Sequence, residues 1–124
     1  MGYKILFADD QEDIRYVTEI LLSVAGYEVI LESNPSFADD LDAASLPDLY
    51  LLDRHIDGAD LLQTCYKLKT HARTKHIPVI MVSADPNIKN LYKEALADEC
   101  IAKPFERYQL TDAIARLLRG KDIQ

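Results

Sequence analysis

The chain has 124 residues, of which 48% are hydrophobic and 28% charged, and its formal net charge is −7 at pH 7. This size and composition indicate one globular domain, over residues 1–124, and exclude a disordered chain. The negative charge argues against direct binding to nucleic acid, which requires a basic face. No apolar stretch approaches the roughly 20 residues that span a membrane, and the first residues do not resemble a secretion signal. We therefore expect a cytoplasmic protein that binds neither nucleic acid nor membrane.

In chain order, the first part of the chain predicts two strands, each followed by a helix. Residues 3–9 and 27–31 are apolar runs typical of strands, and the second lies nearer the sheet edge. Between them, apolar residues recur at three- and four-residue spacing, which indicates a helix that ends at Gly26. Asn34 and Pro35 predict the cap and first turn of a short second helix. The side chains expected to face inward on these helices are Ile14, Val17, Ile20, Leu21, Val24, Phe37, Ala38 and Leu41.

The centre of the chain holds a short apolar run that ends on an acid. Residues 49–52 are too few for a helix, and they indicate a strand buried on both faces of a parallel sheet. Asp53 follows them directly. Ligands of open α/β sheets bind beyond the carboxyl ends of the strands, where a carboxylate costs desolvation energy unless a cation or a reaction partner compensates it. We therefore expect Asp53 to belong to a functional site.

The remaining sequence continues the alternation of strands and helices. We expect a turn at Gly58, a third helix, a strand at 77–82, a short fourth helix after Asp85-Pro86-Asn87, a strand at 100–102, and a last helix from about 106 to 119 that Gly120 ends. Such alternation implies right-handed crossovers and a parallel sheet covered on both faces. The predicted fold class is α/β, with five strands and five helices.

Four of these strands deliver polar side chains to one edge of the sheet, namely Asp9 and Asp10, Asp53, Ser83 and Lys103. Two carboxylates about 4 Å apart repel each other by about 4 kcal/mol at an effective dielectric constant near 20. Proton sharing, which raises a pKa, would relieve this repulsion, and so would a divalent cation. Ligands that are all oxygen favour Mg²⁺ over Zn²⁺, and a few carboxylates completed by water favour Mg²⁺ over Ca²⁺.

With the Lys103 ammonium and the Ser83 hydroxyl, this edge can also hold a phosphoryl group. Mg²⁺ and Lys103 would balance the charge of that group, and Ser83 would donate a hydrogen bond to it. Asp53 stands alone at the end of the central strand and is then the natural nucleophile.

Four sequence motifs resemble those of a known family. They are Ile-Leu-Phe-Ala-Asp-Asp (5–10), Pro-Asp-Leu-Tyr-Leu-Leu-Asp (47–53), Ile-Pro-Val-Ile-Met-Val-Ser-Ala (77–84) and Ala-Lys-Pro-Phe (102–105). Over essentially its whole length the chain resembles the receiver domains of two-component response regulators, the family of the chemotaxis regulator. The resemblance implies a flavodoxin-like, doubly wound sheet with strand order 2-1-3-4-5. It further implies that a sensor histidine kinase or a phosphotransfer protein phosphorylates the domain, which then regulates a downstream effector protein.

The resemblance also assigns roles to the residues that bind the phosphoryl group and the metal. Asp53 would be the phosphoacceptor, and it would bind Mg²⁺ together with Asp10 and the backbone carbonyl of His55. Asp9 would act on the metal largely through water.

The phosphoryl oxygens would contact Ser83 and Lys103, and Ala84 must stay small to admit them. His55 and Asp85 would flank the entrance of the site and tune the lifetime of the phosphate. We hypothesise that their imidazole and carboxylate meet over this entrance. The alternative is that both side chains face water.

The sequence departs from the family pattern at four points. Asp57 and Leu61 stand where the family often has a proline and a glycine, in the loop before the third helix. Cys100 occupies the switch position, where the family usually has a tyrosine or phenylalanine that swings inward on activation. The span from Ser83 to Lys103 is about two residues shorter than usual, so the fourth helix should be clipped. We expect this helix to pack close to the fifth strand and to fill the volume of the missing ring.

Two other functions are compatible with parts of the sequence. One is a degenerate receiver that docks partners without phosphate, which Cys100 and the clipped helix leave open but the complete acidic site opposes. The other is a hydrolase of a phosphorylated small molecule on the same fold. Such an enzyme needs a wide pocket with further polar groups, which the sequence does not indicate, so we expect no turnover of an external substrate.

Overall fold

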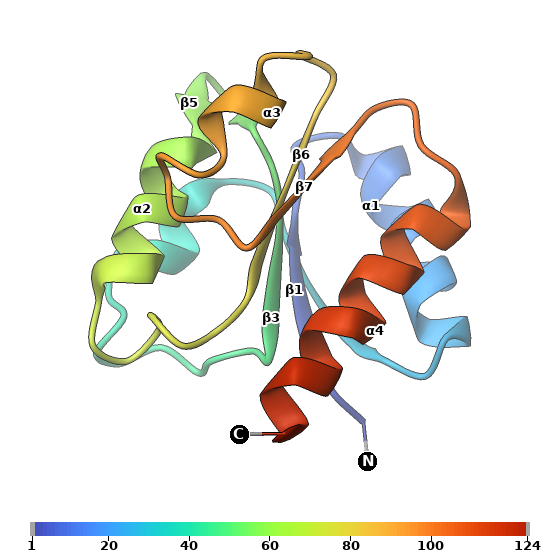
Figure 1. The fold of residues 1–124 in the computed structure, drawn as a ribbon, viewed down its shortest axis with the longest axis horizontal. Helices are drawn as coiled ribbons and strands as arrows, with labels where there is room; N and C mark the ends of the chain where they lie inside the picture. Colours follow the sequence, from blue (N-terminus) through green and yellow to red (C-terminus); the bar gives the residue numbers. More distant parts are fainter. Residues whose placement is uncertain (1, 124) are drawn as a thin grey trace.

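The computed structural model describes residues 2–123, so residues 1 and 124 of the predicted domain lie outside it. Five parallel strands form one sheet with helices on both faces (Figure 1). The strands are β1 (Lys4–Ala8), β2 (Glu28–Glu32), β3 (Leu49–Asp53), β6 (Val79–Ser83) and β7 (Glu99–Ala102). Their order, β2-β1-β3-β6-β7, confirms the predicted flavodoxin-like order, and each strand lies within two residues of its predicted bounds.

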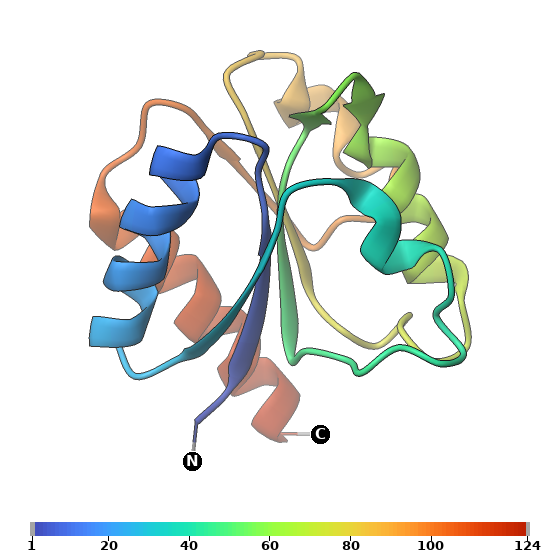
Figure 2. The same cartoon turned by 180° about the vertical axis from the view of Figure 1, so that it is seen from behind.

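Two layers of helices cover the sheet, as Figure 2 shows from behind. One face carries α1 (Glu12–Val24) and α4 (Arg107–Ile123), and the other carries the 3₁₀ helix η1 (Pro35–Ala38), α2 (Leu61–Thr70) and the single-turn α3 (Ile88–Leu91). Alternate residues along the strands belong to two apolar cores, one on each face of the sheet. The first core contains Leu6, Tyr50, Leu52, Leu61, Cys65, Met81 and Ile88, and the second contains Ile5, Phe7, Leu22, Leu51, Ile80 and Ile114.

Two predicted helices differ from the observed ones. The second is only the four-residue η1, capped by the Asn34 side chain, which accepts a hydrogen bond from the Ser36 amide at 2.9 Å. The loop beyond it is not helical, and its carbonyl groups accept hydrogen bonds from the Arg73 guanidinium instead. The last helix does not end at Gly120 but continues to Ile123, since that glycine keeps a helical backbone that costs only about 1 kcal/mol relative to alanine. The described chain therefore has four α-helices rather than the five predicted.

The inward face of α1 was predicted only in part: Ile14 and Leu21 pack against the second core as expected, but the other three residues do not. Val17, Ile20 and Val24 are 60%, 47% and 83% exposed, whereas Leu22 is fully buried. The helix carries two adjacent apolar stripes, and periodicity alone could not decide which one meets the sheet. The exposed stripe (Val17, Ile20 and Val24) leaves an apolar surface on this side of the molecule.

A short hairpin follows β3 that was not predicted as strands. It pairs β4 (His55–Ile56) with β5 (Ala59–Asp60) in antiparallel fashion. Asp57 and Gly58 form its turn with φ angles of +50° and +80°, a conformation typical of tight hairpin turns. The turn expected at Gly58 is therefore present. A proline, which the family often has at position 57, could not adopt this positive φ.

The connection from α3 to β7 contains a strained residue, Leu96, which has φ +64° and a half-exposed side chain. This conformation destabilises a residue with a Cβ atom by roughly 1–2 kcal/mol, and glycine avoids that cost. Part of the gain is offset, because glycine makes the unfolded chain more flexible. We predict that Leu96→Gly increases the free energy of unfolding by up to about 1 kcal/mol, which corresponds to a melting temperature higher by a few degrees. Leu96→Ala is the control, since it removes the same side chain but keeps the strain. Equal melting temperatures of the two variants would contradict the prediction.

Candidate functional site

The carboxyl ends of four strands bring the predicted residues together at one edge of the sheet, at the top of Figure 1. Asp9 directly follows β1, Asp53 is the last residue of β3, and Ser83 is the last residue of β6. Lys103 directly follows β7, and its amide donates a hydrogen bond to the Ser83 carbonyl at 2.9 Å. The parallel register, in which Asp53 pairs with Val82, holds these ends level.

Lys103 lies between two of the acids. Its Nζ atom is 3.4 Å from Oδ2 of Asp53 and 3.8 Å from Oδ2 of Asp9. Asp9 is only 1% exposed, and its Oδ1 atom accepts a hydrogen bond from the Gln11 amide at 2.9 Å. Its Oδ2 atom has no hydrogen-bond partner. A buried carboxylate oxygen without a hydrogen bond is costly, so this edge favours the arrival of a further positive charge.

The surroundings of Asp53 shift the pKa of its carboxyl group. Burial raises the pKa of Asp53 above its ordinary value, and the neighbouring Asp9 raises it further. Lys103 opposes both effects but does not cancel them. Any cation that binds here would lower this pKa and so favour the carboxylate, which is the nucleophilic form.

The donor set fits Mg²⁺ by its chemistry. Among residues 2–123, no three acidic, histidine or cysteine side chains are grouped closely enough to enclose a metal ion by themselves. Mg²⁺ does not require such an enclosure, because it keeps several water ligands and uses one or two carboxylates. Oδ2 of Asp9, which has no hydrogen bond, and the neighbouring carboxylate of Asp53 are donors of the kind that Mg²⁺ uses.

Asp10 is exposed and is tied to the hairpin. Its Oδ2 atom accepts a hydrogen bond from the backbone amide of Asp57 at 2.9 Å. Proline at position 57 would lack this donor, so the departure from the family pattern creates a contact with a predicted metal ligand. The His55 side chain is exposed on the same hairpin, and the role of its carbonyl group stays a prediction.

The predicted pair of His55 and Asp85 over the entrance is wrong. Asp85 instead forms an ion pair with Arg54, whose Nη1 atom lies 3.1 Å from Oδ2 of Asp85. Sequence reasoning missed Arg54 as a functional candidate. The available signal was its charge, since it is a cation within the acidic segment that directly follows the central strand.

Ser83 and Ala84 begin the loop after β6. The Ser83 hydroxyl is buried, and its oxygen accepts a hydrogen bond from the Asp85 amide at 3.0 Å. The hydroxyl proton is therefore left to donate to another group. Ala84 is exposed and adds no bulk beyond its methyl group to this loop.

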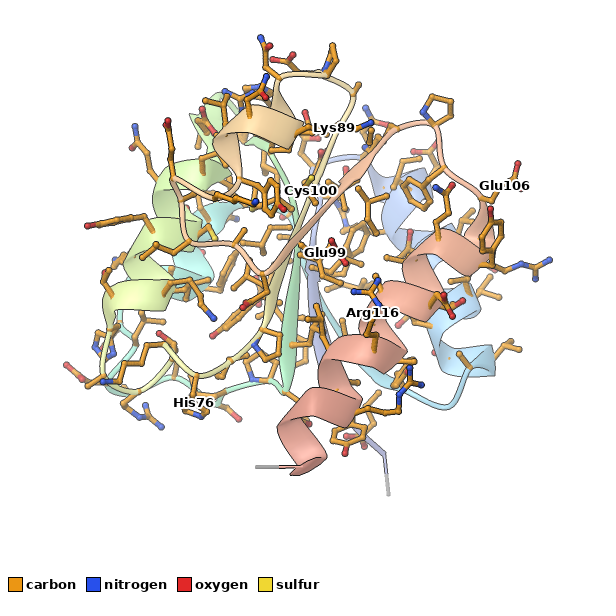
Figure 3. All side chains as sticks on the ribbon, viewed as in Figure 1. His76, Lys89, Glu99, Cys100, Glu106 and Arg116 are labelled. Atoms are coloured by element: carbon orange, nitrogen blue, oxygen red, sulfur yellow. The ribbon has the colours of Figure 1, made fainter. Side chains whose placement is uncertain are left out.

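Cys100 lies on β7 between α3 and α4, with Lys89 and Arg116 nearby (Figure 3). It is partly buried, and this burial raises the pKa of its thiol. The clipped fourth helix is confirmed, since α3 spans four residues. This helix contacts β7, and Cys100 packs against the core that contains Ile88 of α3. Cys100 also lines an open groove of about 530 Å³. The close packing of this helix on the fifth strand is therefore confirmed, but a groove remains on one side of Cys100.

A sequence model of the response regulator receiver domain matches residues 5–115 of the chain. The chain belongs to this family. It is 34% identical over 123 residues to the phosphate regulon transcriptional regulatory protein PhoB of Pseudomonas aeruginosa, covering 96% of this chain and 53% of PhoB. It is 33% identical over 125 residues to the response regulator PleD of Caulobacter vibrioides, covering 98% of this chain and 27% of PleD. This receiver domain thus spans about half of PhoB and about a quarter of PleD.

Solved structures of receiver domains share its fold. The signal receiver domain of a signal transduction histidine kinase from Syntrophus aciditrophicus is 27% identical, with a TM-score of 0.86 and coverage of 96% of this chain and 92% of that one. The response regulator TrrA of Thermotoga maritima, solved with Mg²⁺ and BeF, is 26% identical, with a TM-score of 0.81 and coverage of 94% and 99%. Within residues 2–123, no helix combines the length and apolar content of a membrane-spanning segment.

The raised pKa of Asp53 predicts a pH-dependent stability. Below pH 3.8, the ordinary pKa, the carboxyl group is protonated in both the folded and the unfolded chain and imposes no cost. As the pH rises, the unfolded chain ionises first, so the folded state loses stability until the pH exceeds the raised pKa. Without Mg²⁺, Asp53→Asn should therefore melt above the wild type near pH 7, by an amount that shrinks as the solution is acidified. Thermal unfolding across this range would contradict the raised pKa if the difference stayed constant.

Proposed function

We propose that this domain accepts a phosphoryl group on Asp53 in a Mg²⁺-dependent reaction and thereby regulates a partner protein. The observation that carries the proposal is that Lys103 contacts both a partly buried carboxylate at the end of the central strand and Oδ2 of Asp9, which has no hydrogen bond. Family membership supports the same conclusion, because receiver domains are generally phosphoacceptors rather than enzymes that turn over a substrate.

Each residue of the site has a defined task in this proposal. An oxygen of Asp53 attacks the phosphorus atom of the donor, and the bond from phosphorus to the donor breaks. Lys103, already within 3.4 Å of Asp53, would move its ammonium onto a phosphoryl oxygen and balance the added charge. The free hydroxyl proton of Ser83 would donate to a second phosphoryl oxygen.

The metal would be held by Asp10, Asp53 and the backbone carbonyl of His55, with Asp9 acting largely through water. When bound, Mg²⁺ supplies neutralisation of the charge on the transferring phosphoryl group. Asp10 would lose its hydrogen bond from the Asp57 amide when it binds the metal. Metal binding would therefore be coupled to the conformation of the hairpin. Hydrolysis of the acyl phosphate at the same site would return the domain to its starting state.

The proposed phosphodonor is a sensor histidine kinase or a phosphotransfer protein. The exposed stripe of α1 (Val17, Ile20 and Val24) offers such a protein an apolar surface on the helix that starts beside Asp10. The downstream effector is not specified by these residues. PhoB is by name a transcriptional regulator, but the lack of direct nucleic-acid contact stays a prediction for this chain.

Phosphorylation of Asp53 can be tested with acetyl phosphate. In the presence of Mg²⁺, the wild type should gain the mass of one phosphoryl group, and Asp53→Asn should gain none because it lacks the nucleophile. Asp42→Asn, which removes an exposed acid outside the site, should be labelled like the wild type. Equal labelling of Asp53→Asn and the wild type would overturn the assignment, and no labelling of the wild type would favour a receiver that only docks partners.

Mg²⁺ should stabilise the fold by relieving repulsion among the acids. A ligand that binds only the native state stabilises it by RT ln(1 + [L]/Kd), or about 2.7 kcal/mol at a concentration of 100 Kd. We expect the melting temperature to rise in millimolar Mg²⁺, and Asp10→Ala to lose most of this rise. Asp13→Ala provides a control, because it removes an acid of the first turn of α1 that is assigned no role at the metal. A wild-type melting temperature unaffected by Mg²⁺ would argue against the metal site.

A further inference from the structure

Arg54 directly follows the proposed phosphoacceptor and joins the two loops beside it. Its side chain is only 12% exposed. The Nε and Nη2 atoms contact the two carboxylate oxygens of Asp60 at 3.3 and 3.2 Å, and the Nη1 atom contacts Oδ2 of Asp85 at 3.1 Å. One guanidinium group thus connects the residue that caps α2 with the loop that follows β6.

A chain of hydrogen bonds leads from Arg54 to the hydroxyl group of Ser83. The Oδ1 atom of Asp85 accepts from the Asn87 amide at 3.0 Å, which closes the loop after β6. The amide of Asp85 donates to the Ser83 oxygen, also at 3.0 Å. Because Arg54 holds the other oxygen of the Asp85 carboxylate, it fixes the residue whose amide orients the Ser83 hydroxyl.

Arg54 holds the two loops through the geometry of its hydrogen bonds more than through its charge. The side chains of Asp60 and Asp85 are 34% and 39% exposed, so solvent weakens the ion pairs themselves. The planar guanidinium, however, can bind Asp60 through two atoms while a third reaches Asp85. A lysine has only one charged nitrogen and cannot hold both loops in this way.

We propose that Arg54 is a positioning residue for the phosphoryl group, acting through Asp85 on the hydroxyl of Ser83. This inference rests on the proposed function, since it assumes that Ser83 donates to the phosphoryl group bound at Asp53. With Arg54 present, the loop at residues 84–87 is ordered before the phosphoryl group arrives. Without it, the loop must be ordered on binding, which weakens the affinity.

Beryllofluoride with Mg²⁺, a mimic of the aspartyl phosphate, measures this effect without any turnover. Arg54→Ala should weaken its binding about 3- to 10-fold, the range expected for one lost hydrogen bond. Arg54→Lys should lie between this variant and the wild type. Arg116→Ala is the matched control, because it breaks a 2.7 Å pair between an arginine and Glu99 away from this loop (Figure 3), and it should bind like the wild type.

Two further variants separate positioning from a general loss of stability. Asp60→Asn keeps a residue type that caps helices and one oxygen that can accept a hydrogen bond from Arg54, so it should weaken binding less than Arg54→Ala does. Asp85→Ala should weaken binding as much as Arg54→Ala, and the double variant should be no weaker than either one. Thermal unfolding of each variant confirms that it is folded at the assay temperature. If Arg54→Ala does not fold, Arg54→Lys and Asp85→Ala still carry the test.

The possible outcomes distinguish this inference from the function on which it rests. Failure of the wild type to bind beryllofluoride would overturn the proposed function and the inference together. Normal wild-type binding with an unchanged affinity in Arg54→Ala or Asp85→Ala would overturn the inference alone. Equal losses in Asp60→Asn and Arg54→Ala, or additive losses in the double variant, would also overturn it, because the effect would then not pass through Asp85.

Discussion

The contact of Lys103 with Asp53 and Asp9 is the constraint on which this edge of the sheet depends. Parallel strands bring carboxylates together because all their carboxyl ends meet at one edge, and the repulsion between these groups must be offset. Lys103 offsets part of it, and the Asp57 amide satisfies Asp10. The compensation is incomplete, since Oδ2 of Asp9 has no hydrogen bond and the pKa of Asp53 is raised. A bound cation would relieve both.

The loops around this edge are organised by short polar contacts rather than by an apolar core. The hairpin after β3 is fixed by its Asp57-Gly58 turn and by Asp10, whereas the loop after β6 is fixed by Asp85 and Arg54. Each loop therefore contacts a residue that belongs to the site or directly follows Asp53. A change of charge at Asp53 would first alter the conformation of these two loops, because the strands beneath them are buried on both faces.

The strands and their polar ends could be predicted because both signals are local. Residues 49–52 are apolar at every position, and the apolar run ends at Asp53. This pattern can be recognised without knowing any distant residue. The inward face of α1 could be predicted only in part, since Val17 and Leu22 are equally apolar and only the packing against the sheet distinguishes them. The pair of Arg54 and Asp85 escaped prediction for a related reason. The two residues are 31 positions apart, and their contact depends on the conformations of two loops.

The burial of the two cysteines has a consequence for the chemistry of the whole domain. Burial raises the pKa of the Cys65 thiol to about 12 and also raises that of Cys100, so both remain protonated near neutral pH. Oxidants and electrophiles react with the thiolate form, which is therefore scarce in this protein. The open groove beside Cys100 admits small reagents, yet the thiol it exposes is a weak nucleophile. Both cysteines are therefore poor sites for oxidation or alkylation near neutral pH.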